Sequence, residues 1–542
     1  MRMIHTDSEL KNLADRVVYH GEAFGMTLPE MRFYILDGLE FASLLEKRVY
    51  PVSPVNIWEG KRMVTKKHRI ETGQESSLYY EVVQTGNPSY AYLNATNSAM
   101  MQASVMAHVA GHCEFSELNV LQDSKDDRTE YVMWQVKKVD QGRRQMGEKN
   151  FFNFWNASES ALSMLAPNSQ FNLARSIETD RAMERKSKDV QEKVVKEKEL
   201  YSPLFGTMDN LLRPSVKHDP YETELKSKSR QEALNRRGYR LKAPCQDVLG
   251  FLKNFAPSTP AEYNILDYLY TVHSTTDFVI KTQIMNEGWA MYWEKKIMLE
   301  LFKERACKGI IDYAKVFSGV CYPRPYYMRN PYHLGFHMWC HIEELYRKGR
   351  VSLDFHDEKD QKTKEEWDQH GTETPVQNMR HLVRTVSDYE FLRRFLTPSL
   401  IHEFHLNRIP QRDVARLGIS KRDVVQEDRN WVWLDPEPIK GEMLKFFTHY
   451  YRPRIYVIDA NFEDGGLLLY HRDDGRRLRS NWIQPTLKNI NHIWKGGVSL
   501  ISKNTLYGYS GGYFREMRIP ELKFDLVRER IQEGKKPLVL GR

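Results

Sequence analysis

The sequence predicts a mainly α-helical protein that ends in a small α+β domain, and three observations carry this prediction. The segment NATNSAMMQASVMAHVAGHC, residues 94–113, is rich in small and apolar residues and contains no proline, as in a buried helix. Residues 261–306 contain no proline over more than 40 positions, which favours one or two long helices. After about residue 435 short apolar runs flank turn residues, a pattern that is typical of strands.

The helices of the first two thirds follow from this pattern. Asn94 or Asn97 can cap the helix within 94–113. In the long segment 261–306, Gly288 indicates a bend or a close contact. The segment YHLGFHMWCHIEELYRKG, residues 332–349, predicts a further helix that ends near its glycine.

The end of the chain has a different period. Two apolar runs in RIYVIDANFEDGGLLLYHRDDGRRL, residues 454–478, surround an acidic turn with two glycines and predict a hairpin. The segment WIQPTLKNINHIWKGGVSLISKN, residues 482–504, adds a helix and a further strand.

These patterns divide the chain into five parts. Between the two helical parts, the run RAMERKSKDVQEKVVKEKEL carries interleaved charges of both signs, as in a solvated helix or a mobile insertion. The predicted parts are an N-terminal helical part at 1–172, a charged insertion at 173–240, a second helical part at 241–430, an α+β domain at 435–520 and a tail at 521–542.

Composition restricts the class of protein. Hydrophobic residues make up 41% of the 542 residues and charged residues 28%, a globular balance. The net charge of +8 is mild at this length and is the only feature that favours nucleic-acid binding, so we rank this function last. The five cysteines form no C-x-x-C pair, and no apolar run is long enough to cross a membrane. We therefore expect a cytoplasmic protein without a membrane span.

Two histidines give the sharpest chemical motif. His108 and His112 are four residues apart on a predicted helix and so share a face, a spacing that suits two imidazole ligands of one metal ion. In zincin helices a glutamate follows the first histidine, whereas Val109 stands here. The spacing alone also fits two ordinary polar residues of a helix interface.

Glu287 is the candidate third ligand. It lies between Met285 and Trp289 in an apolar helix, where a carboxylate is costly to bury unless it is paired, protonated or metal-bound. With His108 and His112 it would provide two nitrogens and one oxygen for a divalent ion, with zinc expected first, and leave a position for water. A hydrogen-bonded structural glutamate is the alternative.

Further candidates surround these three residues. Glu294 lies two turns after Glu287, and Glu114 follows His112; either is a candidate general base. His337 and His341 continue a histidine stripe that begins at His333 and would either line the site or form a polar interhelical seam.

Three long motifs together identify a family resemblance. MAHVAGHCEF, KTQIMNEGWAMYWEKKI and NPYHLGFHMWCHI resemble, in this order, three signature segments of the SpoVR family, the proteins like stage V sporulation protein R. NPSYAYLNATNS, DVLGFLKNFAP, FLTPSLIHEFHL and YVIDANFEDGGLLLYHRDDGRRL are similar to further family segments, so that the resemblance spans about residues 20–505.

Two positions depart from the family pattern. Glu294 stands where members commonly have histidine, and His341 stands where they have aspartate. This exchange of an acid and an imidazole suggests that Glu294 and His341 face each other.

The resemblance implies a bacterial protein of spore cortex formation or of stress and stationary-phase responses. It also implies two partners, a PrkA-type serine kinase and a von Willebrand-like domain protein. We expect a helical, gluzincin-like core and a metal-dependent hydrolase that acts on an amide bond. The alternative is a non-catalytic regulator of such a kinase, in which the same polar cluster is structural.

Overall fold

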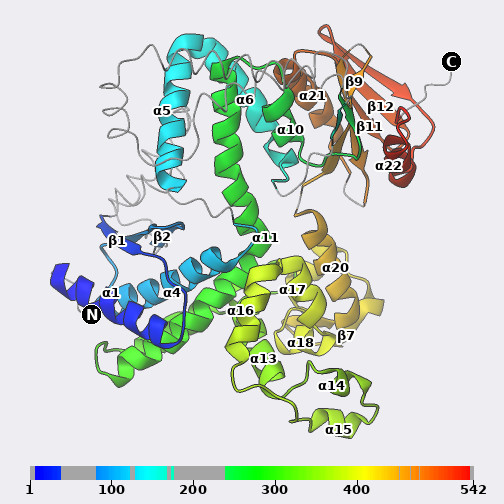
Figure 1. Ribbon diagram of the computed structural model, residues 1–542. Helices are drawn as coiled ribbons and strands as arrows, with labels where there is room; N and C mark the ends of the chain where they lie inside the picture. Colours follow the sequence, from blue (N-terminus) through cyan, green and yellow to red (C-terminus); the bar gives the residue numbers. More distant parts are fainter. Residues whose placement is uncertain are drawn as a thin grey trace, which may run out of the picture. The chain divides into compact units, whose positions relative to one another are not determined.

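A computed structural model describes residues 7–37, 81–122, 128–167, 173–175, 239–450, 452–463, 465–474 and 477–537, and Figure 1 shows its path. The described chain is mainly α-helical with a small C-terminal α+β part, as predicted. Most of the predicted insertion 173–240 lies outside the described residues. Among the described residues, no helix is both long and apolar enough to cross a membrane.

The chain forms two compact units, each built from two separate segments. The first unit combines residues 1–128 with 278–450, and the second combines residues 129–277 with 451–542. One helix, α11 (Pro260–Lys303), contributes residues to both units.

The first unit contains most of the helices. The elements of this unit that precede α11 are α1 (Asp7–Ala23), β1 (Met31–Leu36), β2 (Glu81–Gln84), β3 (Ser89–Asn94) and α4 (Ala99–Leu118). The strands form one sheet in the order β1-β3-β2, with β1 parallel and β2 antiparallel to β3. After α11 follow α12 (Ile310–Val320), α13 (Pro331–Arg347), α14 (Leu353–Asp357), α15 (Gln361–Glu365), α16 (Pro375–Thr385), α17 (Asp388–Phe395), α18 (Pro398–Glu403), β6 (Arg408–Pro410), α19 (Gln411–Leu417), β7 (Val424–Glu427), β8 (Trp431–Leu434) and α20 (Pro436–His449).

The helix α4 is buried on nearly all sides, as its apolar composition predicted. Its cap differs from the prediction: Ser98, rather than Asn94 or Asn97, accepts a hydrogen bond from the amide of Met101. Asn94 instead ends β3, and its side-chain oxygen accepts a hydrogen bond from the amide of Thr96. A helix buried all round forms the centre of a core, so polar residues on α4 must find partners inside the protein.

Gly288 makes the close helix contact that the sequence indicated. A Cβ atom at Gly288 would lie 2.2 Å from the backbone carbon of Gly335 on α13. Two glycines face to face let the backbones of α11 and α13 touch at this point. The α13 helix begins with Pro331 and is capped by Asn330, whose side chain accepts a hydrogen bond from the amide of Tyr332.

The second unit contains the C-terminal sheet. Helices α5 (Arg128–Met146), α6 (Glu148–Ser160) and α10 (Val248–Phe255) precede it, and the two-stranded pair β4 (Leu173–Arg175) and β5 (Tyr239–Leu241) joins the ends of the charged segment. The five-stranded sheet has the order β13-β12-β11-β10-β9. Its elements are β9 (Arg454–Phe462), β10 (Gly466–Arg472), α21 (Ser480–Trp494), β11 (Val498–Ser502), β12 (Thr505–Ser510), β13 (Tyr513–Arg518) and the final helix α22 (Phe524–Gln532).

The predicted hairpin and the following helix and strand are confirmed. Strands β9 and β10 pair antiparallel around the acidic turn, and α21 then leads to β11, which runs parallel to β10. A parallel neighbour requires such a crossover connection, and a helix provides it here.

Candidate metal centre

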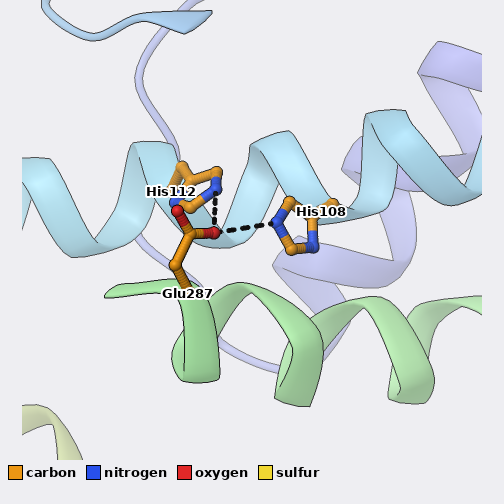
Figure 2. A group of neighbouring side chains, drawn as sticks. All are labelled: His108, His112 and Glu287. Atoms are coloured by element: carbon orange, nitrogen blue, oxygen red, sulfur yellow. Dashed lines mark ion pairs between the residues drawn. The ribbon is translucent and has the colours of Figure 1, made fainter. Parts of the chain in front are cut away.

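Small residues on α4 and α11 allow these helices to lie close together. A Cβ atom at Gly111 would lie only 2.6 Å from the Cα of Ala290. The two faces that carry the predicted ligands therefore meet, and Figure 2 shows Glu287 of α11 pointing between His108 and His112 of α4.

The structure brings the three predicted metal ligands together. The Oε2 atom of Glu287 lies 3.5 Å from Nε2 of His108 and 3.4 Å from Nε2 of His112. One ligand atom from each residue lies within 4.8 Å of the other two. Among the described residues, no other set of three or more histidine, cysteine, aspartate or glutamate residues has its ligand atoms this close together.

The other ring nitrogens are held by α11. Nδ1 of His108 lies 2.9 Å from Oε2 of Glu294, and Nδ1 of His112 lies 2.9 Å from Oδ1 of Asn286. A carboxylate oxygen and an amide oxygen can only accept, so both Nδ1 atoms carry the proton. In a neutral imidazole the Nε2 atom then has a lone pair, and both lone pairs face the carboxylate of Glu287.

Three potential metal-ligand atoms therefore converge at one place. The buried Oε2 atom of Glu287 accepts no hydrogen bond from the described residues. Its separations from the rings exceed the roughly 2.7–2.9 Å of a charge-assisted hydrogen bond. Ligands at about 2.1 Å from a tetrahedral ion lie about 3.4 Å apart, so the spacing fits a shared zinc ion.

The charge state of Glu287 depends on the two histidines that face it. Burial by itself raises the pKa of the Glu287 carboxyl, but the charge and hydrogen bonds of His112 and His108 in their protonated form outweigh burial and hold the pKa well below its ordinary value. Glu287 is therefore an anionic ligand candidate at neutral pH.

The centre is buried but not sealed. Side-chain exposure is 7% for His108, 12% for His112 and 19% for Glu287, although the Oε2 atom of Glu287 is itself buried. Trp289 and Trp293 of α11 are fully buried beside this segment. Of the three candidate ligands, Glu287 thus has the largest exposed fraction.

Glu294 does not lie where the departure from the family pattern suggested, which was opposite His341. Its Oε1 accepts a hydrogen bond of 2.6 Å from Ser104, and its Oε2 lies against His108. The expected pairing with His341 is wrong, because both oxygens of Glu294 are engaged on the α4 side. Glu294 thereby orients His108, as carboxylates behind metal-binding histidines do.

Glu114 lies apart from the cluster in an internal network. Its Oε1 accepts hydrogen bonds from Arg380 (2.8 Å) and from the Thr27 amide (3.3 Å), and its Oε2 accepts one from Trp289 (2.9 Å). Burial raises the pKa of Glu114, against the lowering effect of Arg380. With both oxygens engaged, this placement supports a structural role for Glu114 and does not support the predicted role of general base.

The histidine stripe of α13 faces α18 rather than the metal ligands. The rings of His333 and His337 lie 6.0 and 5.5 Å from the ring of Phe404 at the end of α18. His341 is half-buried, and burial lowers its pKa although Glu403 and Glu344 raise it. His337 and His341 therefore are not brought into the centre.

Sequence reasoning missed two residues that complete the centre. Ser104 lies one helical turn before His108, and Asn286 directly precedes Glu287. Helical spacing could have found Ser104, whereas the partner of Asn286 depends on how α4 and α11 meet.

Comparison with known proteins places these residues in a family. The sequence model described as SpoVR like protein matches residues 5–434. The chain is also 24% identical over 473 residues to the uncharacterized protein YcgB of Escherichia coli strain K12, which covers 83% of this chain and 84% of that protein. No solved structure matches the chain. Because the family match covers most of the chain and all residues of the centre, the protein belongs to the SpoVR family.

Proposed function

We propose that this protein is a metal-dependent hydrolase with one zinc ion held by His108, His112 and Glu287. The observation that carries the proposal is the convergence of the Nε2 atoms of His108 and His112 on one carboxylate oxygen of Glu287, at 3.5 and 3.4 Å. Two nitrogens and one oxygen from the protein leave a fourth position of a tetrahedral ion for water or substrate. The ligand set supports a gluzincin-like centre.

The bound ion would supply Lewis acidity toward a substrate carbonyl, which suits hydrolysis of an amide bond. The protein would contribute fixed ligands: Glu294 and Asn286 hold the two rings with Nε2 toward the ion. These contacts leave the ligand set organised before substrate arrives.

The general base of this centre differs from that of zincin helices. Val109 occupies the usual glutamate position and is fully buried. Glu114 and Glu294 have both oxygens engaged. Glu287 is the most exposed acid at the centre, and we assign to its second oxygen, Oε1, the acceptance of the proton from the attacking water.

The test begins with metal content. Purified, tag-free protein is analysed by elemental mass spectrometry beside His108→Ala/His112→Ala, with His337→Ala/His341→Ala as the control that changes two histidines of the same spacing. The proposal expects about one equivalent of zinc in the wild type and control, and none in the first variant while its circular dichroism is retained. Absence of metal from wild-type protein after reconstitution would overturn the proposal.

Reaction class is tested on zinc-loaded wild-type protein, with Glu287→Ala, which lacks a proposed zinc ligand, as the control. A mixture of N-acylated amines and peptides is incubated with wild type and with Glu287→Ala, and new primary amines are measured. Amine release by the wild type that the variant lacks supports hydrolysis. A zinc-loaded protein that releases no amine from any substrate would contradict the hydrolase assignment while leaving the metal site intact.

A regulatory role is the second candidate, and the buried polar links between α4 and α11 favour it. Ser104, His108 and His112 each bond to a residue of α11, an arrangement that can be structural alone. The protein would then act through a PrkA-type serine kinase and a von Willebrand-like domain protein. This candidate expects metal-free protein to bind the kinase with undiminished affinity.

A further inference from the structure

A buried aspartate reaches into the middle of α11 just before the metal ligand. Asp388, the first residue of α17, is fully buried. Its carboxylate accepts hydrogen bonds of 2.9 Å from the amide of Ile284 and 3.0 Å from the amide of Met285.

Such a contact is unusual inside a helix. In a regular helix the amides of residues 284 and 285 donate to the carbonyl oxygens four residues earlier. A carboxylate that accepts from two successive amides is the arrangement of a helix N-terminus, where an acidic side chain caps the first turn. A side chain that inserts into the ladder of backbone hydrogen bonds is one of the causes of a local bend in a helix.

The same turn is held from α13. Nε1 of Trp339 donates a hydrogen bond of 2.9 Å to the carbonyl oxygen of Met285. The carbonyl oxygen of Ile284 lies 2.0 Å from where a Cβ atom of Gly335 would be, so only glycine fits there. Contacts from α13 and α17 thus fix the backbone of two residues that directly precede Asn286 and Glu287.

We infer that Asp388 is a positioning residue for the metal centre, which caps α11 from inside and aims Asn286 and Glu287 at His112. The inference rests on the proposed function, because it assigns Asp388 to the same zinc site. An uncompensated buried carboxylate is costly, and the two amide bonds offset that cost while fixing the turn. This helical turn of α11 then fixes the Glu287 carboxylate and the Asn286 oxygen relative to the histidine rings.

The experiment compares Asp388→Asn and Asp388→Ala with a matched control, Asp247→Asn. Asp247 is also fully buried and accepts from the amides of Ala166 and Gly250, but it belongs to the second unit. Zinc affinity is measured by competition with a chromogenic chelator at a temperature where all variants are folded. We expect Asp388→Ala to weaken zinc binding by roughly 10–100-fold, Asp388→Asn by less because it keeps one acceptor, and Asp247→Asn to leave it unchanged.

A second measurement is made on metal-free protein. Nitrogen-15 spectra of the imidazoles report whether Nδ1 of His112 keeps the proton that it donates to Asn286. We expect this state in the wild type and in Asp247→Asn, and its loss in Asp388→Ala. Equal zinc affinities and unchanged His112 spectra in the Asp388 variants would overturn the inference. No zinc binding by the wild type would instead overturn the proposed function, and the His112 spectra would still decide the role of Asp388.

Discussion

Two helices of the first unit carry histidine pairs of the same spacing in different surroundings. The ring centres of His108 and His112 on α4 lie 4.6 Å apart, and so do those of His333 and His337 on α13. On α4, each Nδ1 is held by an oxygen of α11 and a carboxylate faces both rings. On α13, the rings pack against Phe404 instead.

The difference shows what spacing can and cannot establish. A helix brings residues four apart onto one face whatever their function. The partners across the interface decide between a metal centre and an aromatic contact, because they fix the tautomer and supply the third ligand. The predictions below test this contrast, from the largest expected effect to the smallest.

Glu287→Gln separates the metal centre from a structural ion-pair network. Zinc affinity should fall more than about 100-fold, because the only anionic ligand is lost. The metal-free variant should become more stable by about 1 kcal/mol, because a glutamine amide can donate to the ring lone pairs. Zinc affinity is measured by chelator competition and stability by urea unfolding. Loss of stability in the metal-free variant would show that the rings are protonated and paired with Glu287.

Gly288→Ala should break the helix contact that places Glu287. Its Cβ atom would meet the backbone of Gly335 at 2.2 Å, and overpacking of this kind costs about 1–3 kcal/mol. The control is Gly319→Ala on α12, where a Cβ atom meets nothing within 4 Å and should stabilise by about 0.5–1 kcal/mol. Urea unfolding of both variants measures the effect, and equal stabilities would contradict the close contact.

Glu294→Gln tests the carboxylate behind His108. We expect about a tenfold loss of zinc affinity, because an amide polarises the ring less than a carboxylate. The control is Glu403→Gln, which removes the negative charge that raises the pKa of His337. This variant should have no effect on zinc binding. Isothermal titration of zinc into both metal-free variants provides the measurement, and similar affinities would argue against an orienting role for Glu294.

The histidine pair of α13 should affect the pH dependence of stability and should not affect metal binding. Burial first, and then the charge of His337, lowers the pKa of His333 to about 3. The unfolded chain binds this proton near pH 6.5 and the folded protein does not, so stability should fall as pH decreases below about 6.5. Urea unfolding from pH 7 to 5 should show a shallower fall in His333→Phe than in the wild type. An identical pH dependence would contradict a neutral, buried His333.

The sequence allowed the core of the centre to be predicted because its chemistry is local. His108 and His112 share a helical face, and Glu287 is an acid in an apolar helix. Glu294 lies two turns from Glu287 on the same face of α11, which explains why it joins the α4 side and not His341.

The remaining residues depend on tertiary contacts that no local pattern contains. Glu114 lies two positions after His112 and therefore points about 200° away around the helix, toward Arg380. Asp388 is a distant residue whose importance arises only where α17 meets α11. The division into two units, each from two segments, likewise follows from packing.

The most direct test of the central claim is diffraction from crystals of the zinc-loaded protein at wavelengths on both sides of the zinc absorption edge. The account predicts one anomalous peak about 2.0–2.2 Å from Nε2 of His108, Nε2 of His112 and Oε2 of Glu287. A map without a peak at this position, or with zinc bound only elsewhere, would contradict the assignment of these three residues as a metal centre.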